Sequence, residues 1–285
     1  MRRAFLMVDS PSVELTKHHG LGNDFLVALN PSRELGSAEA KQWCDRRTGI
    51  GADGLIVATA AGTVTDSDST NWTMVLWNAD GGRAEISGNG IRCLGQAIGR
   101  HLVGEGEIGS DIELSIQTDA GPRKLRLFPT GDVTWQVRAE MGSVSPGQAP
   151  SLDWVDAGLN PEHQQCVDVG NPHIVAVVDS AQFDNADMAV VGPIIEAGYP
   201  GGINVHVVNI TSHRSLDLKV WERGVGVTQA CGSGACAAAW AAHHHGLVGS
   251  EITVGMPGGS ASVELTDDQV YLIGPATFVG SIRIA

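Results

Sequence analysis

The chain has 285 residues, of which 42% are apolar and 18% charged, so it can bury a core and global disorder is excluded. Its 32 acidic and 18 basic residues give a formal net charge of -14. That balance argues against a general nucleic-acid binder, because such proteins need a basic face. No apolar run reaches the roughly 18 residues that a membrane span needs, and Asp9 cuts short the apolar run of the N-terminal tail. Five widely spaced cysteines without a CxxC pair favour a reducing, cytoplasmic setting.

Short runs of β-branched and apolar residues, separated by turn residues, predict strands along most of the chain. In the first half these runs span residues 13–17, 25–29, 55–59, 72–77, 112–118, 124–128 and 134–141. In the second half they span residues 165–169, 173–178, 203–210, 215–221, 260–265, 270–274 and 277–284. Helices are predicted over residues 38–47, 90–103 and 234–246. Many strands and few helices predict an α+β fold.

An internal repeat relates the two halves of the chain. Residues 76–90 resemble residues 220–234, and residues 22–28 resemble residues 170–176 in the same order. Two matching blocks at about half the chain length predict two copies of one domain, joined near the turn at Gly131. The predicted domains are residues 1–131 and 132–276, and the last strand, at about 277–285, is expected to pair back with the first domain.

The two long helices are predicted to begin at equivalent glycine-rich turns, Ser87-Gly88-Asn89-Gly90 and Cys231-Gly232-Ser233-Gly234. Glycines let a ligand approach the backbone, and the free N–H groups and the helix dipole attract an anion. Two such ends, related by a pseudo-twofold axis, can grip one carboxylate, so a small acid is the expected ligand. The same position is expected to lower the thiol pKa of Cys231 and to make it a reactive thiolate.

Other familiar chemistry is missing from the sequence. Gly224-Val225-Gly226 is followed by Gln229 where a dinucleotide fingerprint needs glycine, and there is no Walker A or HExxH pattern. The three histidines at 243–245 are consecutive at a helix end, so they face different directions and favour a solvated cluster over a metal site. No lysine lies in a context that suggests a pyridoxal Schiff base. Neither a metal nor a cofactor is therefore expected.

Several motifs resemble those of the diaminopimelate epimerases, in the order of that family, from about Leu15 to the C-terminus. They are residues 19–25, 45–54, 78–81, 88–93, 170–173, 222–224 and 230–236. The resemblance implies two pseudo-symmetric α+β domains. Each is a mostly antiparallel sheet wrapped around a central helix, and the active site lies in the interdomain cleft.

The resemblance also implies the reaction. Enzymes of this family invert one α-carbon and convert LL-diaminopimelate to the meso form without a cofactor, for lysine and peptidoglycan synthesis. Two cysteines, one per domain, flank the substrate: one removes the α-proton and the other delivers a proton to the opposite face. Paired helix N-termini in a water-poor cleft can stabilise the carbanion that forms. The expected setting is the cytoplasm, the only expected partner is the amino-acid substrate, and a homodimer is the expected assembly.

By position, the resemblance assigns Cys231 to the cysteine of the second domain. The residues that fall where the family contacts the substrate are Asn23, Asn78, Asn171, Asn204, Glu222 and Arg223. Arg223 suits the distal carboxylate, which it can bind in bidentate fashion, and Glu222 suits an ammonium group. The reacting carboxylate would be held by the backbone amides of Gly88, Asn89, Gly232 and Ser233.

The sequence departs from the family pattern at the first cysteine, where it has Ser87, and at Val227, where the family has glutamate. A serine hydroxyl is a far weaker acid–base group than a thiol unless another base activates it. Ser87 is therefore expected to impair inversion, whether it is a natural or an engineered residue. Two alternatives stay open: a related racemase or epimerase of proline, hydroxyproline or histidine, and a non-catalytic amino-acid binding protein.

Overall fold

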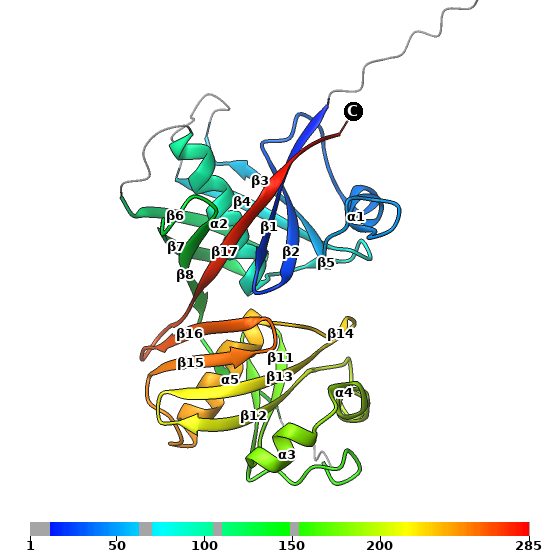
Figure 1. Ribbon diagram of the computed structural model, residues 1–285, viewed down its shortest axis with the longest axis vertical. Coiled ribbons are helices and arrows are strands. Elements are labelled where there is room, and N and C mark those ends of the chain that lie inside the picture. The colour runs from blue at the N-terminus through cyan, green and yellow to red at the C-terminus, as the bar shows by residue number, and fades with distance from the viewer. Residues whose placement is uncertain (1–11, 63–69, 105–109, 149–153, 285) are drawn as a thin grey trace, which may run out of the picture.

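The computed structural model describes residues 12–62, 70–104, 110–148 and 154–284. The predicted N-terminal tail lies outside them. The described chain forms two lobes stacked end to end, with one long helix inside each lobe (Figure 1). Seventeen strands form one continuous, curled sheet, and the described residues add five helices, so the fold is mostly β.

The upper lobe of Figure 1 contains most of the first half of the chain. Its elements are β1 (Val13–Gly20), β2 (Asn23–Leu29), α1 (Ser37–Cys44), β3 (Gly54–Ala60), β4 (Asn71–Asn78), β5 (Arg83–Ala84), α2 (Gly88–Val103), β6 (Ile112–Thr118), β7 (Gly121–Phe128) and β8 (Thr134–Gly142). The lower lobe contains β9 (Ser145–Pro146), β10 (His163–Asp168), β11 (Pro172–Val177), α3 (Ser180–Asn185), α4 (Met188–Ala197), β12 (Asn204–Ser212), β13 (Ser215–Glu222), β14 (Gly226–Val227), α5 (Gly232–His244), β15 (Glu251–Met256) and β16 (Gly259–Leu265). The last strand, β17 (Val270–Ile284), runs from the lower lobe into the upper one.

The strands of the upper lobe close into a ring around α2. The ring runs β1-β2-β3-β4-β6-β7-β8-β17 and returns to β1, where residues 277–284 of β17 pair with β1. Twelve of the sixteen residues of α2 are buried, so the helix is the core of its ring rather than a cover on one face. Small residues make this possible: a Cβ on Gly99 would lie 2.5 Å from the ring of Trp135.

The lower lobe repeats the same pairing scheme around α5. β10-β11, β12-β13, β15-β16 and β16-β17 are antiparallel, whereas β11-β12 and β13-β15 are parallel. The corresponding steps of the upper lobe, β2-β3 and β4-β6, are also parallel. Nine of the thirteen residues of α5 are buried, and six of these nine are alanines, which lets the sheet approach the helix closely.

The structure corrects several of the predicted elements. The helix predicted over residues 38–47 ends at Cys44, and the two strands predicted over 270–274 and 277–284 are one strand, β17. Both long helices begin two residues before the predicted start, at Gly88 and Gly232. Two helices and several strands of the structure were not predicted from the sequence: α3, α4, β5, β9, β14 and β15. No helix of the described residues is long and apolar enough to cross a membrane.

Candidate active site

The two long helices begin at capping side chains that correspond in the repeat. Ser87 is the N-cap of α2, and its Oγ accepts a hydrogen bond from the N–H of Gly90 at 3.0 Å. Cys231 is the N-cap of α5, and its Sγ accepts from the N–H of Gly234 at 3.3 Å. The cap satisfies one N–H group in each first turn, which leaves the other first-turn N–H groups and the positive helix end for an anion.

The helix N-termini meet at two glycines. A Cβ built on Gly232 would lie 2.7 Å from the Cα of Gly88, and a Cβ built on Gly88 would lie 2.9 Å from the Cα of Gly232. Each built Cβ would also lie 2.9 Å from Cδ2 of Leu272, a side chain of β17. Because no side chain fits there, the residue type at both positions follows from the close approach of the two helices.

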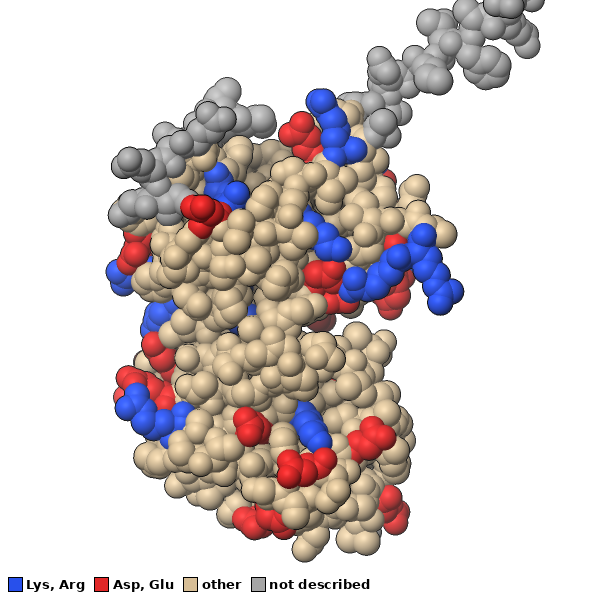
Figure 2. All heavy atoms as spheres, in the orientation of Figure 1, with Lys and Arg blue, Asp and Glu red and all other residues tan. Residues whose placement is uncertain are grey.

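A cavity of about 680 Å³ opens at this junction, with walls from both lobes. The surface view is notched at the waist between the lobes (Figure 2). All twelve predicted site residues line the cavity: Asn23, Asn78, Ser87, Gly88, Asn89, Asn171, Asn204, Glu222, Arg223, Cys231, Gly232 and Ser233. The sequence motifs, scattered over more than two hundred residues, therefore converge on one place.

The thiol of Cys231 differs from the expectation of a lowered pKa. The residue is 4% exposed, and burial together with the nearby carboxylate of Glu222 raises its pKa well above the ordinary value. Hydrogen bonds from Ser233 and from the N–H of Gly234 act in the opposite direction but are outweighed. Cys231 is therefore a neutral thiol near neutral pH, and the prediction of a ready thiolate was wrong because it considered the helix end alone.

Glu222 is the acidic group next to this thiol. Its carboxylate hydrogen-bonds to the Cys231 side chain, and its Oε1 accepts from the hydroxyl of Thr228 at 2.6 Å. Burial raises the pKa of Glu222, which the two hydrogen bonds only partly offset. A carboxylate with a raised pKa is suited to accept a proton from its neighbour.

Ser87 has a plainer environment than Cys231. It is half-buried, and its Oγ accepts the capping hydrogen bond from the N–H of Gly90. Among the described residues, no histidine, lysine or carboxylate is hydrogen-bonded to its Oγ. The activating base that a serine needs for strong acid–base chemistry is not seen beside it.

Two asparagines of the second half are held by fixed partners. Asn204 donates to the carbonyl of Pro172 at 2.9 Å, and its Oδ1 accepts from the backbone N–H of Arg223 at 3.0 Å. Asn171 Oδ1 lies 2.8 Å from Nε2 of His173. Since the oxygens of both side chains are engaged, each amide has an N–H left to donate, which suits a carboxylate.

Behind Asn171 lies a buried histidine pair that the sequence analysis did not single out. Nδ1 of His173 lies 2.8 Å from Nε2 of His206, and the two rings stack. Because Asn171 accepts from His173 Nε2–H, His173 Nδ1 accepts from His206 Nε2–H. Burial lowers both pKa values, that of His206 to about 3, so the pair is neutral. His173 is thus occupied at both nitrogens.

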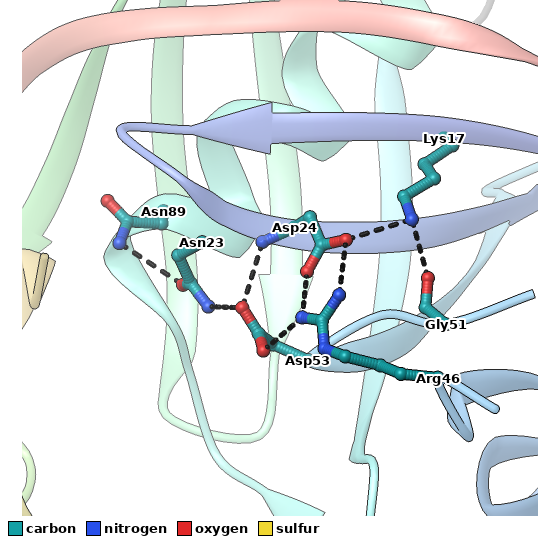
Figure 3. Close-up of polar contacts among 7 residues, drawn as sticks. All are labelled: Lys17, Asn23, Asp24, Arg46, Gly51, Asp53 and Asn89. Carbon is teal, nitrogen blue, oxygen red and sulfur yellow. Dashed lines mark hydrogen bonds and ion pairs between the residues drawn. The ribbon is translucent and has the colours of Figure 1, made fainter. Parts of the chain in front are cut away.

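A charged network on the first-half wall of the cavity was also missed. Arg46 bridges the carboxylates of Asp24 and Asp53 at 2.6 and 2.7 Å, and Lys17 pairs with Asp24 at 2.9 Å (Figure 3). Burial opposes the ionisation of Asp24, but the bonds from Arg46 and Lys17 outweigh it and lower its pKa. Asp53 also accepts from Asn23 at 2.6 Å. The sequence did carry a signal for this network, because the motif at residues 45–54 contains a cluster of charged residues.

The histidine cluster and the other cysteines were the remaining candidate chemistry of the sequence. The described residues contain no group of three or more His, Cys, Asp or Glu side chains arranged to hold a metal ion. His243 and His244, of the histidine cluster, are exposed, and His244 stacks on Trp240. Cys44, Cys93, Cys166 and Cys236 are buried, and burial raises their pKa values.

Comparisons with known proteins agree on one family. The family model described as diaminopimelate epimerase matches residues 15–146 and 165–279. The chain is 37% identical to the diaminopimelate epimerase of Desulfitobacterium hafniense, covering 94% of this chain and 96% of that protein. It is 38% identical to that of Sphingopyxis alaskensis, covering 93% and 94%. The fold is similar to that of a predicted epimerase from Pseudomonas aeruginosa, with a TM-score of 0.73 at 14% identity, covering 95% and 99% of the two chains.

Proposed function

Because the chain belongs to the diaminopimelate epimerase family, we propose that it inverts the α-carbon of LL-diaminopimelate to give the meso form, without a cofactor. The observation that supports this most directly is the junction of the two helices. Two first turns, capped by Ser87 and Cys231 and touching at Gly88 and Gly232, face one cavity. A carboxylate bound there lies at two positive helix ends, with one capping side chain from each half.

The reacting carboxylate binds to the backbone amides of Gly88, Asn89, Gly232 and Ser233. When the Cα–H bond breaks, its electron pair spreads into this carboxylate, and the amides and helix dipoles stabilise the added charge. Cys231 serves one face of the α-carbon and Ser87 the other. When Cys231 acts as the base, its own proton passes first to the hydrogen-bonded carboxylate of Glu222; when it acts as the acid, the neutral thiol donates directly.

The rest of the substrate is held by the cavity walls. Arg223, with the N–H donors of Asn171 and Asn204, binds the distal carboxylate. Asn23 and Asn78 contact the substrate from the first half of the chain. Until it accepts the thiol proton of Cys231, the ionised carboxylate of Glu222 balances an ammonium group of the substrate.

We assign the two halves to pseudo-symmetric domains, residues 1–131 with the last strand, and residues 132–276. The repeated order of parallel and antiparallel pairs supports this division. β17 pairs with β16 of the lower lobe and with β8 and β1 of the upper lobe, so the seam between the domains lies at this strand and at β8 beside it. The cellular role that follows is the supply of meso-diaminopimelate for lysine and peptidoglycan synthesis in the cytoplasm. A homodimer stays a prediction.

The test is proton NMR of LL-diaminopimelate with the protein in deuterated buffer. The proposal predicts loss of the α-proton signal and appearance of the meso form. Binding of diaminopimelate without any α-proton exchange would favour the non-catalytic binding protein, a reading that the plain surroundings of Ser87 support. If the α-proton of proline, hydroxyproline or histidine exchanges faster than that of diaminopimelate, the protein is instead a related racemase or epimerase of that amino acid.

A further inference from the structure

Arg92 is a buried cation without an ion pair among the described residues. It lies in the second turn of α2 and is 0% exposed. Its Nη2 donates to Oδ1 of Asn89 at 2.6 Å, whereas Nε and Nη1 have no hydrogen-bond partner within the described part of the chain. Burying an unbalanced charge costs free energy, so an anion that arrives nearby gains more from this cation than it would from an exposed one.

The guanidinium lies close to the junction of the helices. A Cβ on Gly274 would lie 3.0 Å from Cζ of Arg92, and a Cβ on Gly20 would lie 3.2 Å from Nη2, so two glycines make room for the group. Gly274 is two residues after Leu272, whose side chain touches both Gly88 and Gly232. Two residues along a strand span roughly 6.5 Å on one face of the sheet. Arg92 is therefore in the layer directly behind the carboxylate site.

Arg92 also determines how Asn89 is oriented. Arginine is only a donor, so Asn89 must turn its oxygen toward it. The Nδ2 of Asn89 then donates to Oδ1 of Asn23 and to the carbonyl of Ala230, both at 3.1 Å. Ala230 immediately precedes Cys231. Arg92 and Asn89 thus connect the start of α2 to the start of α5, across the two halves of the site.

We propose that Arg92 is a positioning residue for the proton transfer. Through Asn89 it holds the helix N-termini in register, and its buried positive charge favours a carboxylate at their junction. The inference deepens the proposed function and rests on it. Since Asn89 uses only one N–H of the guanidinium, a single cationic donor is sufficient for this role.

Arg92→Lys and Arg92→Met test the role, because lysine keeps one donor and the charge while methionine keeps neither at similar length. We expect Arg92→Lys to retain the α-proton exchange rate within about tenfold. Arg92→Met should bind diaminopimelate about tenfold more weakly by calorimetry and exchange its α-proton about 100-fold more slowly. The matched controls are Arg100→Lys and Arg100→Met, on the same helix but at the surface, where Arg100 stacks on Phe278 and both changes should leave the rate unchanged.

Equal rates for Arg92→Met and the parent would overturn the proposal, and so would equal losses in the lysine and methionine variants when both are folded by circular dichroism. If Arg92→Met does not fold, Asn89→Ala replaces it. Asn89→Ala breaks the connection between the two helix starts but keeps the charge of Arg92, so its α-proton exchange must be slower than that of Arg92→Lys. Faster exchange in Asn89→Ala than in Arg92→Lys overturns the inference. A parent that binds diaminopimelate but never exchanges its α-proton refutes the epimerase function instead, and the calorimetric difference between the two Arg92 variants still decides the role of the charge.

Discussion

The contact between Gly88 and Gly232 makes Gly232→Ala the most direct test of the site geometry. The added Cβ would lie 2.7 Å from the Cα of Gly88 and 2.9 Å from Cδ2 of Leu272. Carbon atoms in contact are about 3.5–4.0 Å apart, so the overlap is roughly 0.8 Å or more. Leu272 can rotate away, but Gly88 meets the new methyl with its backbone. The two helices must therefore separate.

Two opposing effects set the size of the change. Alanine favours a helix over glycine by about 1 kcal/mol in a helix interior, and by less at the first position, which Gly232 occupies. Forcing a methyl into a packed contact costs about 1–3 kcal/mol. We therefore expect a net loss of stability of about 1–2 kcal/mol. A displacement near 1 Å between the anchors of Ser87 and Cys231 should lower the α-proton exchange rate about 100-fold.

Urea unfolding and NMR-detected exchange measure the two effects on the same preparation. Gly280→Ala is the matched control, because a Cβ there has no heavy atom within 4 Å and the residue also lies in regular structure, in β17. It should leave both the unfolding midpoint and the exchange rate unchanged or raise the midpoint slightly. A Gly232→Ala protein with the parent's midpoint and rate would refute the argument that the closeness of the helices builds the site.

Three further changes test the site and its surroundings. Ser87→Cys, kept reduced, should raise the inversion rate by about 100-fold, because a thiol is the stronger acid–base group; an unchanged rate would mean that the serine side does not limit inversion. Arg223→Ala should weaken diaminopimelate binding about tenfold or more by calorimetry, and an unchanged affinity would remove Arg223 from the site. Burial raises the pKa values of Cys93 and Cys236 to about 12. These thiols stay protonated in the native state while the unfolded chain loses their protons above pH 9. The free energy of unfolding should therefore fall by about 1.4 kcal/mol per pH unit for each thiol between about pH 9 and 12, and Cys93→Ala should make the fall shallower in urea titrations.

The parts that the sequence predicted well have local causes. At both long helices a capping side chain followed by Gly-x-Gly marks the first turn, so both halves of the site were found from their turns. The same holds for most strands, which are short runs of β-branched residues. The helix α4 was missed because it contains Gly192 and Pro193, which are poor helix residues. Packing explains why glycine stands at position 192, because Gly192 lies against the ring of Trp221 and a Cβ there would be 2.2 Å from Cγ of that ring.

The properties that the sequence did not predict depend on distant neighbours. A helix N-terminus lowers a thiol pKa, and that local effect is present at Cys231. The burial of the thiol and the carboxylate of Glu222, nine residues earlier, reverse it. The bridge that Arg46 forms between Asp24 and Asp53 likewise requires the strands to be in place first. The charge balance of a folded site depends on the whole fold. Residue types alone therefore predict which residues form the site better than they predict the protonation states of those residues.

The two sides of the site are equivalent in backbone and unequal in chemistry. In the repeat, Ser87 corresponds to Cys231, and by the same offset Asn78 corresponds to Glu222. The hairpins that present the latter pair also correspond, since β4 pairs with β5 and β13 with β14. Under the proposed function, one face of the substrate would therefore meet a thiol with a carboxylate beside it, whereas the other would meet a hydroxyl and an amide that does not titrate. Proton removal and return on the Cys231 face should then be faster than inversion, because every inversion must also pass through the weaker pair.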